Sequence, residues 1–463
     1  NTTGGDNVAI GNSALGANTT AANNTAVGSA ALLANTTGSQ NLAMGDNALA
    51  ANTTADYNTA LGTSTLQLNT TGTRNVATGA FSLTANTTGD GNVAMGYQAL
   101  KSNTTADNNT AIGDQALEFN TTGSENTALG GGALDANTTA NDNTAIGYNA
   151  LGVNTTGASN SVLGAYALDG NTTGANNVAI GRASLGANTT ANNNTAVGYA
   201  SLTANTTGTA NTAVGGAAGD AITTGSYNTA VGQSALTALT TGGSNTTMGY
   251  AAGQGCTGAS NFNVAIGDET MLIAGEKSYN TAVGSDAMRG ITTGSANVGV
   301  GYNSLAALTT GTNNVAMGSG SLDANTTGGS NTAIGENALT TNTTASNNTA
   351  VGKSALNDNT TGTRNSALGA SALQENTTGN YNTAVGFQSL QSSTTGTHNT
   401  ALGDAALSAN TTASNNTAVG QSALFTNTTG TNNASLGFSS LLSNTTGSNN
   451  TALGAYALDA NTT

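Results

Sequence analysis

The chain repeats one 17-residue pattern of apolar and polar positions along its whole length. An Asn-Thr-Thr triplet opens most units, at Asn1, Asn18 and onward, and the residues can be numbered 1 to 17 from that asparagine. Position 7 is Asn and position 11 is Gly in all 27 units. Position 10 is Val, Ile, Leu or Met except at Thr78, and position 15 is Leu or Met except at Gly219 and Gly253. Positions 5, 6, 12, 13, 16 and 17 vary and hold nearly all the charges, which predicts that they face solvent.

The spacing of the apolar positions predicts short β-strands rather than helices. Two large apolar positions in each repeat are too few for the apolar stripe of a helix, and Gly, Thr and Asn are weak helix formers. Positions 8 to 10 predict a strand, as in Val8-Ala9-Ile10, with positions 8 and 10 pointing into the coil. A second short strand is expected at positions 14 and 15. Disorder is disfavoured, because a low-complexity linker has no reason to keep these positions in phase.

Stacked coils account for the fixed positions. In a parallel β-solenoid, equivalent residues of successive coils lie about 4.8 Å above one another and form ladders. Gly at position 11 fits a corner with positive φ, and Asn at position 7 fits either left-handed backbone or a side-chain ladder. Position 9 is Ala in 23 of 27 units, so a second surface is expected to pack closely against it. The predicted fold is all-β, a parallel β-solenoid, or β-roll, of 27 coils, about 130 Å long at this spacing.

The regularity of the repeat divides the predicted rod into three stretches. Residues 1–255 and 291–463 read as regular coils, and residues 256–290 as irregular coils with a one-residue insertion, all in one continuous rod. The extra residue is expected to bulge out of the turn before Asn263.

Apolar residues replace the opening asparagine in the middle of the chain. Position 1 is Ile222, then Leu239, Cys256 and further apolar residues as far as Leu308. This substitution predicts that position 1 faces inward or lies at a subunit contact. Ile222 and Cys256 follow the units that lack Leu at position 15, at Gly219 and Gly253, and are expected to refill part of the missing volume.

Composition narrows the classes of function. Of 463 residues only 6% are charged, the net charge is −15, and seven Lys and Arg cannot form a patch for nucleic acid. No stretch approaches the ~20 apolar residues of a membrane span, and the single cysteine, Cys256, excludes an internal disulfide framework. His398 is the only histidine and has no acid–base or metal-binding partner within its own unit. The sequence therefore predicts no enzymatic activity, no cofactor and no metal site.

The thin core predicts self-association. So short a coil buries little apolar area against a large ordering entropy. Lateral packing is therefore expected, most simply as a homotrimer through the alanine face, and a single solenoid held by Asn and Thr ladders is the alternative. Both ends of the sequence follow the consensus without capping units, which predicts further coils or end-to-end stacking.

Five tyrosines recur at position 12, three coils apart. They are candidate ligand-facing residues for surface glycans, and exposed tyrosines at a variable position are the alternative. The Asn-Thr-Thr triplet also satisfies the N-glycosylation sequon, although a ladder-forming turn would use the same residues. The row consists of Tyr97, Tyr148, Tyr199, Tyr250 and Tyr302.

Three segments carry a resemblance to a known family. Residues 7–11, 177–181 and 263–267 all read Asn-Val-Ala-Ile-Gly. This motif resembles the Ser-Val-Ala-Ile-Gly core of the head repeats in trimeric autotransporter adhesins of the YadA type. Asn-Thr-Ala-Val-Gly, followed by two free residues and Ala-Leu, is also similar to repeats in bacteriophage tail fibres and bacterial surface proteins.

The resemblance implies a left-handed β-roll, a homotrimer and attachment to surfaces. The repeat unit is longer than the usual head repeat, and no coiled-coil stalk or membrane anchor is present in the sequence. A bacterial fibre at the cell surface and a virion appendage such as a phage tail fibre both remain open. The function expected is that of an extracellular structural or adhesive fibre, and the alternative is a solenoid that binds glycans or, less in keeping with its adjacent threonines, ice.

Overall fold

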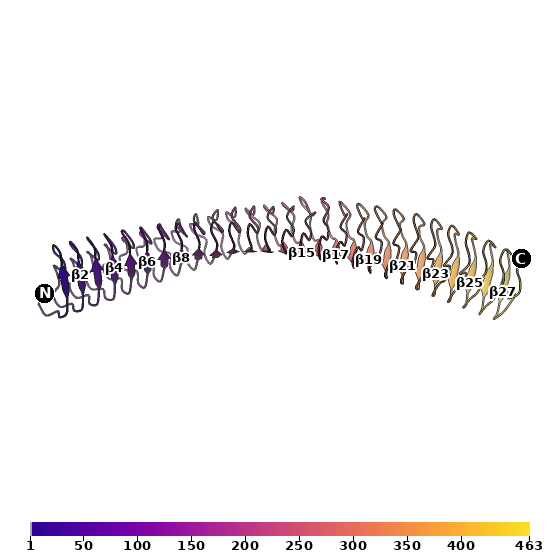
Figure 1. The fold of residues 1–463 in the computed structure, drawn as a ribbon, viewed down its shortest axis with the longest axis horizontal. Coiled ribbons are helices and arrows are strands. Elements are labelled where there is room, and N and C mark those ends of the chain that lie inside the picture. The colour runs from indigo at the N-terminus through magenta and orange to yellow at the C-terminus, as the bar shows by residue number, and fades with distance from the viewer. Residues whose placement is uncertain (1) are drawn as a thin grey trace. The chain divides into compact units, whose positions relative to one another are not determined.

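The computed structural model describes residues 2–463, and its regular elements are 27 strands of three residues each. The strands belong to two compact units, Asn1–Asn228 and Thr229–Thr463. In each unit one strand occurs per coil, at positions 8 to 10 of the repeat (Figure 1).

The first unit contains strands β1 to β13. They are β1 (Val8–Ile10), β2 (Thr25–Val27), β3 (Leu42–Met44), β4 (Thr59–Leu61), β5 (Val76–Thr78), β6 (Val93–Met95), β7 (Thr110–Ile112), β8 (Thr127–Leu129), β9 (Thr144–Ile146), β10 (Ser161–Leu163), β11 (Val178–Ile180), β12 (Thr195–Val197) and β13 (Thr212–Val214).

The second unit contains strands β14 to β27. They are β14 (Thr229–Val231), β15 (Thr246–Met248), β16 (Val264–Ile266), β17 (Thr281–Val283), β18 (Val298–Val300), β19 (Val315–Met317), β20 (Thr332–Ile334), β21 (Thr349–Val351), β22 (Ser366–Leu368), β23 (Thr383–Val385), β24 (Thr400–Leu402), β25 (Thr417–Val419), β26 (Ala434–Leu436) and β27 (Thr451–Leu453).

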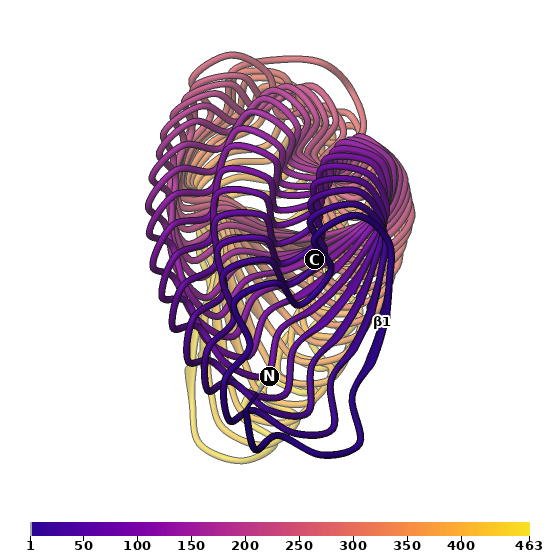
Figure 2. The same ribbon diagram turned by 90° about the vertical axis from the view of Figure 1, so that its left-hand side faces the viewer.

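Each strand pairs in parallel with the strand of the neighbouring coil in its unit. The register places Val8 opposite Thr25 in the first unit and Thr349 opposite Ser366 in the second, one repeat apart in each case. Figure 2, which faces the β1 end, shows the coils of the first unit overlying one another as closed loops. The parallel β-solenoid predicted from the repeat is therefore confirmed in both units.

The face of each strand that points into the coil is the opposite of the one predicted. Position 9 is buried in every strand from β2 to β27, whereas position 10 is half-buried or exposed in all of them. Ala26 is fully buried between the partly exposed Thr25 and Val27. The reason is steric: the interior of the coil is already filled by the leucine at position 15, so only a small side chain fits opposite it. The expectation that positions 8 and 10 point inward and that the alanine face meets a partner is wrong.

The predicted second strand at positions 14 and 15 is also wrong. This segment consists of turns, and the buried leucines of position 15 have positive φ, as at Leu32 (51°) and Leu49 (51°). Hydrogen bonds between coils continue through it nonetheless, because the Leu32 amide donates to the carbonyl of Ala48 in the next coil at 3.0 Å. The coil therefore keeps a ladder of backbone hydrogen bonds where its backbone is not extended.

Glycine at position 11 meets two demands, as the sequence predicted. Gly113 has φ +141°, and a Cβ there would lie 2.5 Å from the carbonyl oxygen of Gly130 in the next coil. Only glycine combines this φ with so close an approach between two backbones. The left-handed residue beside the invariant asparagine is position 6, with φ +60° at Asn23, and not the asparagine itself.

From Asn18 to Asn444, position 1 faces the interior, as expected, except where the exposed Ala274 occupies it. The asparagines there are buried, and so are Ile222, Leu239 and Cys256. Ile222 does occupy the space left by glycine at position 15, since a Cβ on Gly219 would lie 3.1 Å from its Cδ1.

The second predicted refilling is not found. At Gly253 the nearest side chain is Thr247, whose Cγ2 would lie 2.5 Å from an added Cβ, and Cys256 is not among the nearest atoms. Threonine replaces alanine at position 9 in this coil, so the missing leucine is compensated from the strand.

The inserted residue lies in the second unit, between β15 and β16. Their register is one residue longer than the repeat, with Thr246 opposite Val264. Gly258 has φ +53°, and its carbonyl accepts hydrogen bonds from the amides of Thr241 and Gly242, both at 3.0 Å. The regular pattern resumes before Asn263, so the extra residue is absorbed among residues 257–259.

Candidate functional site

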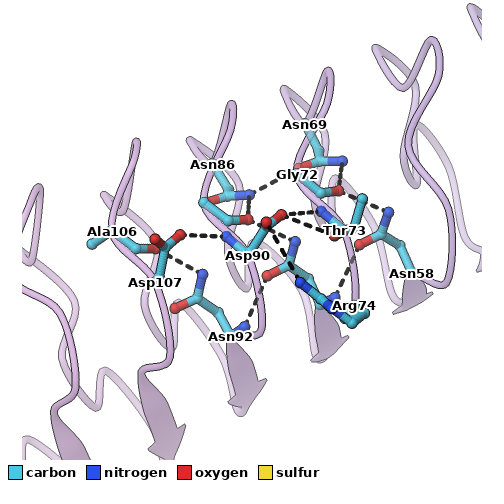
Figure 3. Close-up of polar contacts among 12 residues, drawn as sticks. Asn58, Asn69, Gly72, Thr73, Arg74, Asn86, Asp90, Asn92, Ala106 and Asp107 are labelled. Atoms are coloured by element: carbon cyan, nitrogen blue, oxygen red, sulfur yellow. Dashed lines mark hydrogen bonds and ion pairs between the residues drawn. The ribbon is translucent and has the colours of Figure 1, made fainter.

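The invariant asparagine of position 7 connects successive coils through both ends of its side chain. In Figure 3, Asn58 Oδ1 accepts the backbone N–H of Asn75 in the next coil at 3.0 Å. Asn58 Nδ2 donates to the carbonyl of Gly72, position 4 of that coil, at 2.9 Å. The side chain is fully buried, and an amide supplies the acceptor and the donor that this site needs. This explains why no other residue type occurs at position 7.

The asparagines of position 1 form a second buried ladder that meets the first. Asn86 Nδ2 donates to Asn69 Oδ1 at 2.8 Å, and Asn69 Nδ2 donates to the carbonyl of Gly72 at 2.9 Å (Figure 3). The Gly72 carbonyl therefore accepts from Asn58 and Asn69 together. The ladder expected for the asparagines is confirmed, and its two rows are joined at position 4 of the coils that have asparagine at position 1.

A third ladder at position 5 was missed by the sequence analysis. Asp90 Oδ1 accepts the amide of Thr73 at 2.6 Å, and Asp107 Oδ1 accepts the amide of Asp90 at 2.7 Å (Figure 3). Ser39 fills the same role through its hydroxyl. Asp, Asn and Ser all present an oxygen at this distance, so position 5 varies in residue type while its hydrogen bond is kept.

The outward face of the strands carries an apolar row in each unit. We call positions 8 and 10 of β1 to β27 the strand face. Position 8 is mostly Thr or Val, and position 10 is apolar in every coil except that of Thr78, so the row is continuous in the second unit and has one interruption in the first. The most exposed members of position 10 are Ile10, Met44, Met95, Leu129, Leu163, Ile180, Val214, Met248, Met317, Ile334, Leu368, Leu402, Leu436 and Leu453.

The strand face contains an apolar groove of about 300 Å³ over β25 to β27. Val419, Leu436 and Leu453 line it from position 10. It opens where Ala434 replaces the β-branched residue of position 8, between Thr417 and Thr451. The Cγ and Oγ atoms that threonine has at this position are missing at Ala434, which leaves an apolar hollow in the row.

The five tyrosines proposed as ligand-facing are exposed, but the structure does not bring them together. Tyr97 packs edge-on against Phe81 of the preceding coil at 6.1 Å between ring centroids, and Tyr148 packs edge-on against Tyr166 of the next coil at 5.4 Å. These contacts join positions 12 and 13 of adjacent coils, a relation that the single-position row did not reveal. The remaining three, Tyr199, Tyr250 and Tyr302, are exposed as well.

A second set of rings stands at position 6. Tyr381 stacks on His398 with centroids 4.9 Å apart and an angle of 14° between the planes. The Arg364 guanidinium lies 5.2 Å from the Tyr381 centroid on the other side and donates to its hydroxyl. The only histidine thus has planar neighbours in the preceding coils, which a search within its own unit could not find.

A lysine lies buried in the irregular coils of the second unit. Lys277 is 1% exposed, and its Nζ donates to the carbonyls of Ile273 at 2.7 Å and Ile291 at 2.8 Å. Burial lowers the pKa of Lys277 to about 8 and raises the pKa of the buried Cys256 thiol to about 11, and each charge opposes the other's shift. The exposed Ala274 holds position 1 here, and the amine bonds the carbonyl of the next residue in that column, Ile291.

Residues 2–463 contain neither a group of metal-binding side chains nor a helix that could span a membrane. No three His, Cys, Asp or Glu side chains gather there as metal ligands. The same residues form no helix with the length and apolarity that crossing a membrane requires.

Comparison with known proteins adds no assignment: no protein-family model matches the chain, and no curated protein matches it. Its own geometry is therefore the basis for any functional proposal, and the strand face runs along every coil of both units.

Proposed function

We propose that this chain is a structural segment of an extracellular or virion-borne fibre, whose copies associate through the strand face. The observation that carries the proposal is the row of aliphatic side chains at position 10, which the fold leaves half-buried or exposed in every coil. Contiguous apolar surface of this extent is typical of interaction sites.

A second copy of the chain is the partner that fits this face best. Its strand face repeats with the same rise of about 4.8 Å per coil, so the side chains of two copies stay in phase along a whole unit. An unrelated partner has no reason to share that repeat. The Asn-Val-Ala-Ile-Gly motif, which resembles the head repeats of trimeric adhesins, favours three copies, and the strand face replaces the alanine face as the proposed contact.

The area of the strand face suits a stable interface. Burying an aliphatic side chain removes about 60–120 Å² from water, and position 10 is about half exposed where it is most open. The seven most open members of position 10 in the first unit then offer about 300 Å², and the half-buried members of the row contribute further toward the ~800 Å² per partner of a standard interface. Position 8 adds to this area.

Sedimentation of the full chain and of a charged variant tests the proposal. The variant carries Ile112→Lys, Leu129→Lys and Ile146→Lys, at position 10 of three successive coils. Wild type should sediment as an oligomer of the 44.6 kDa chain and the variant as a monomer, because three lysines would be desolvated in the contact.

The matched control places lysines at position 12 of the same three coils, as Asp114→Lys, Gly131→Lys and Tyr148→Lys. It should remain oligomeric, and circular dichroism should show both variants folded. A monomeric wild type, or equal dissociation of both variants, would refute self-association through the strand face.

Glycan binding is the second candidate function, favoured by the exposed ring pairs. Aromatic faces are common platforms in binding surfaces, and Tyr148 is fixed against Tyr166. Polysaccharide retention by wild type that is lost in Tyr148→Ala with Tyr199→Ala would support it. Retention unchanged by both substitutions would exclude these tyrosines.

A further inference from the structure

Position 16 of the first unit carries a column of charged residues. Lys101, Glu118, Asp135 and Asp169 occupy this position in four of five successive coils, and Gly152 interrupts them. Lys101 Nζ lies 3.3 Å from Glu118 Oε1 in the next coil. Within this column, an ammonium group therefore pairs with the carboxylate one coil away.

Glu118 has a partner for each of its oxygens. Its Oε1 is paired with Lys101, and its Oε2 accepts from Gln115 Nε2, at position 13 of the same coil, at 3.0 Å. The carboxylate is almost fully buried, so these two partners provide the compensation that such burial requires.

Asp135 lacks both kinds of partner. Position 13 of its own coil is Gly132 where Glu118 has Gln115, and the next residue of the column is Gly152. Asp135 Oδ1 is buried without a hydrogen-bond partner. Burial, and secondarily the charge of Glu118, raises the pKa of Asp135 to about 6, which means that its negative charge is poorly compensated.

The two glycines leave a cavity of about 230 Å³ beside Asp135. Asp169 lines its far side, two coils away, and Asn149, Val153 and Tyr166 complete the wall. Burial also raises the pKa of Asp169. The Tyr166 ring is held edge-on by Tyr148. Two carboxylates, an amide and an aromatic ring thus surround one space.

We propose that this cavity binds a small organic dication, an aliphatic diamine with primary ammonium groups. One ammonium pairs with Asp135, as Lys101 pairs with Glu118, and the other pairs with Asp169. The aliphatic chain lies over Gly152, against Val153 and Tyr166. This site is separate from the strand face and does not depend on self-association.

The dimensions of the cavity match this class of ligand. Two coils span roughly 9–10 Å. An extended chain of four carbons separates its two nitrogens by about 6 Å, so it bridges the pair when each ammonium–carboxylate hydrogen bond of about 2.8 Å lies at an angle to the chain. At about 30 Å³ for each water, the cavity holds roughly seven to eight waters, enough for a ligand of six heavy atoms. A cation beside a tyrosine face gains further attraction.

Calorimetric titration of the full chain with 1,4-diaminobutane tests the proposal. One saturable site per chain is expected, with affinity at least tenfold lower for 1-aminobutane and no heat for 1,4-butanediol. Asp135→Asn and Asp169→Asn should each weaken diamine binding at least tenfold. Equal binding of the diol, or the absence of a saturable site, would overturn the proposal.

Two further variants separate the cavity from general charge effects. Asp220→Asn removes a carboxylate at the same repeat position, also with an unpartnered Oδ1, that does not line the cavity, and should bind as wild type. Gly152→Lys adds an internal ammonium beside Asp135 at a site with normal φ and a nearest contact of 3.4 Å for the new Cβ, and should abolish binding. Gly216→Lys, where a Cβ meets nothing within 4 Å, should leave binding intact; loss of binding in Asp220→Asn or Gly216→Lys would refute the site.

Discussion

The position 7 ladder makes a sharp prediction for Asn109→Asp. Asn109 is fully buried, its Oδ1 accepts the amide of Asn126 at 3.0 Å, and its Nδ2 donates to the carbonyl of Gly123 at 2.9 Å. Aspartate keeps the acceptor but loses the donor, and an ionised carboxylate would face the Gly123 carbonyl oxygen. Asn108→Asp is the matched control, because the neighbouring position 6 is exposed and already carries aspartate elsewhere, at Asp142.

The loss of stability expected for Asn109→Asp depends on pH, and the contact with the Gly123 carbonyl determines whether it grows or shrinks as the pH rises. Burial opposite a carbonyl raises the pKa of the new carboxyl above its unfolded value of about 3.9, since only the protonated form can donate to Gly123. Stability is then retained below pH 4 and lost as the pH rises through the folded pKa. We expect Asn109→Asp to lose about 2–4 kcal/mol at pH 7 and about 1 kcal/mol at pH 4.

Hydrogen exchange in strand β7 is the direct assay, because it reports local opening of this coil. A loss of about 3 kcal/mol lowers protection factors by about 150-fold at pH 7, and most of this protection should return at pH 4. Asn108→Asp should change protection by less than about twofold. Equal losses in the two variants, or a loss in Asn109→Asp that does not lessen at pH 4, would show that the ladder does not contribute in this way.

Two further predictions concern the buried lysine and the position 11 glycines. Because the folded pKa of Lys277 is lowered to about 8, the unfolded chain binds more protons at this lysine above that pH, which contributes about 1 kcal/mol of stability between pH 8 and 9. The raised pKa of Cys256 acts in the opposite direction in wild type and in Lys277→Met alike. The stability of wild type relative to Lys277→Met in urea denaturation should therefore rise by about 1 kcal/mol over this range, and a constant difference would contradict the assignment. Gly113→Ala should cost at least about 2–3 kcal/mol in the same assay, since its Cβ would lie 2.5 Å from the carbonyl oxygen of Gly130 at φ +141°. Gly131→Ala, with ordinary 3.6 Å contacts, should be nearly neutral, and equal losses would rule out the proposed close approach.

The stacking of coils was predictable because it depends on periodicity. A strict repeat with invariant Asn and Gly specifies ladders and corners, and both were found where the sequence placed them. Which face of each strand points into the coil was not predictable, because Val8 and Ile10 are apolar like core residues. Threonine in most other units at position 8 was the available signal that this face points outward, and the constant smallness of position 9 reflects crowding by leucines such as Leu32 inside the coil.

The candidate sites were harder to predict, because they are formed by contacts between residues of different coils, and these contacts are not visible when one repeat position is followed along the sequence. Tyr148 meets Tyr166, and Tyr381 meets His398, across different coils, so the pairs appear only when the stack is built. The cavity beside Asp135 arises from two glycines in different columns, each unremarkable in its own unit. Lys277 gave a misleading signal, because a charged residue at a glycine position is expected to point outward.

Wherever position 1 is asparagine, the joined asparagine ladders make the neighbouring coils interchangeable. Every bond of these ladders connects two fixed positions of the repeat, either within one coil, as from Asn69 to Gly72, or between neighbouring coils, as from Asn86 to Asn69. Any neighbour that carries the same three positions can supply the partners. Duplication or excision of one whole repeat therefore restores every ladder contact, whereas the loss of a single residue breaks several at once. Recombination between such repeats changes the number of coils in whole steps, and each product inherits a complete hydrogen-bond network.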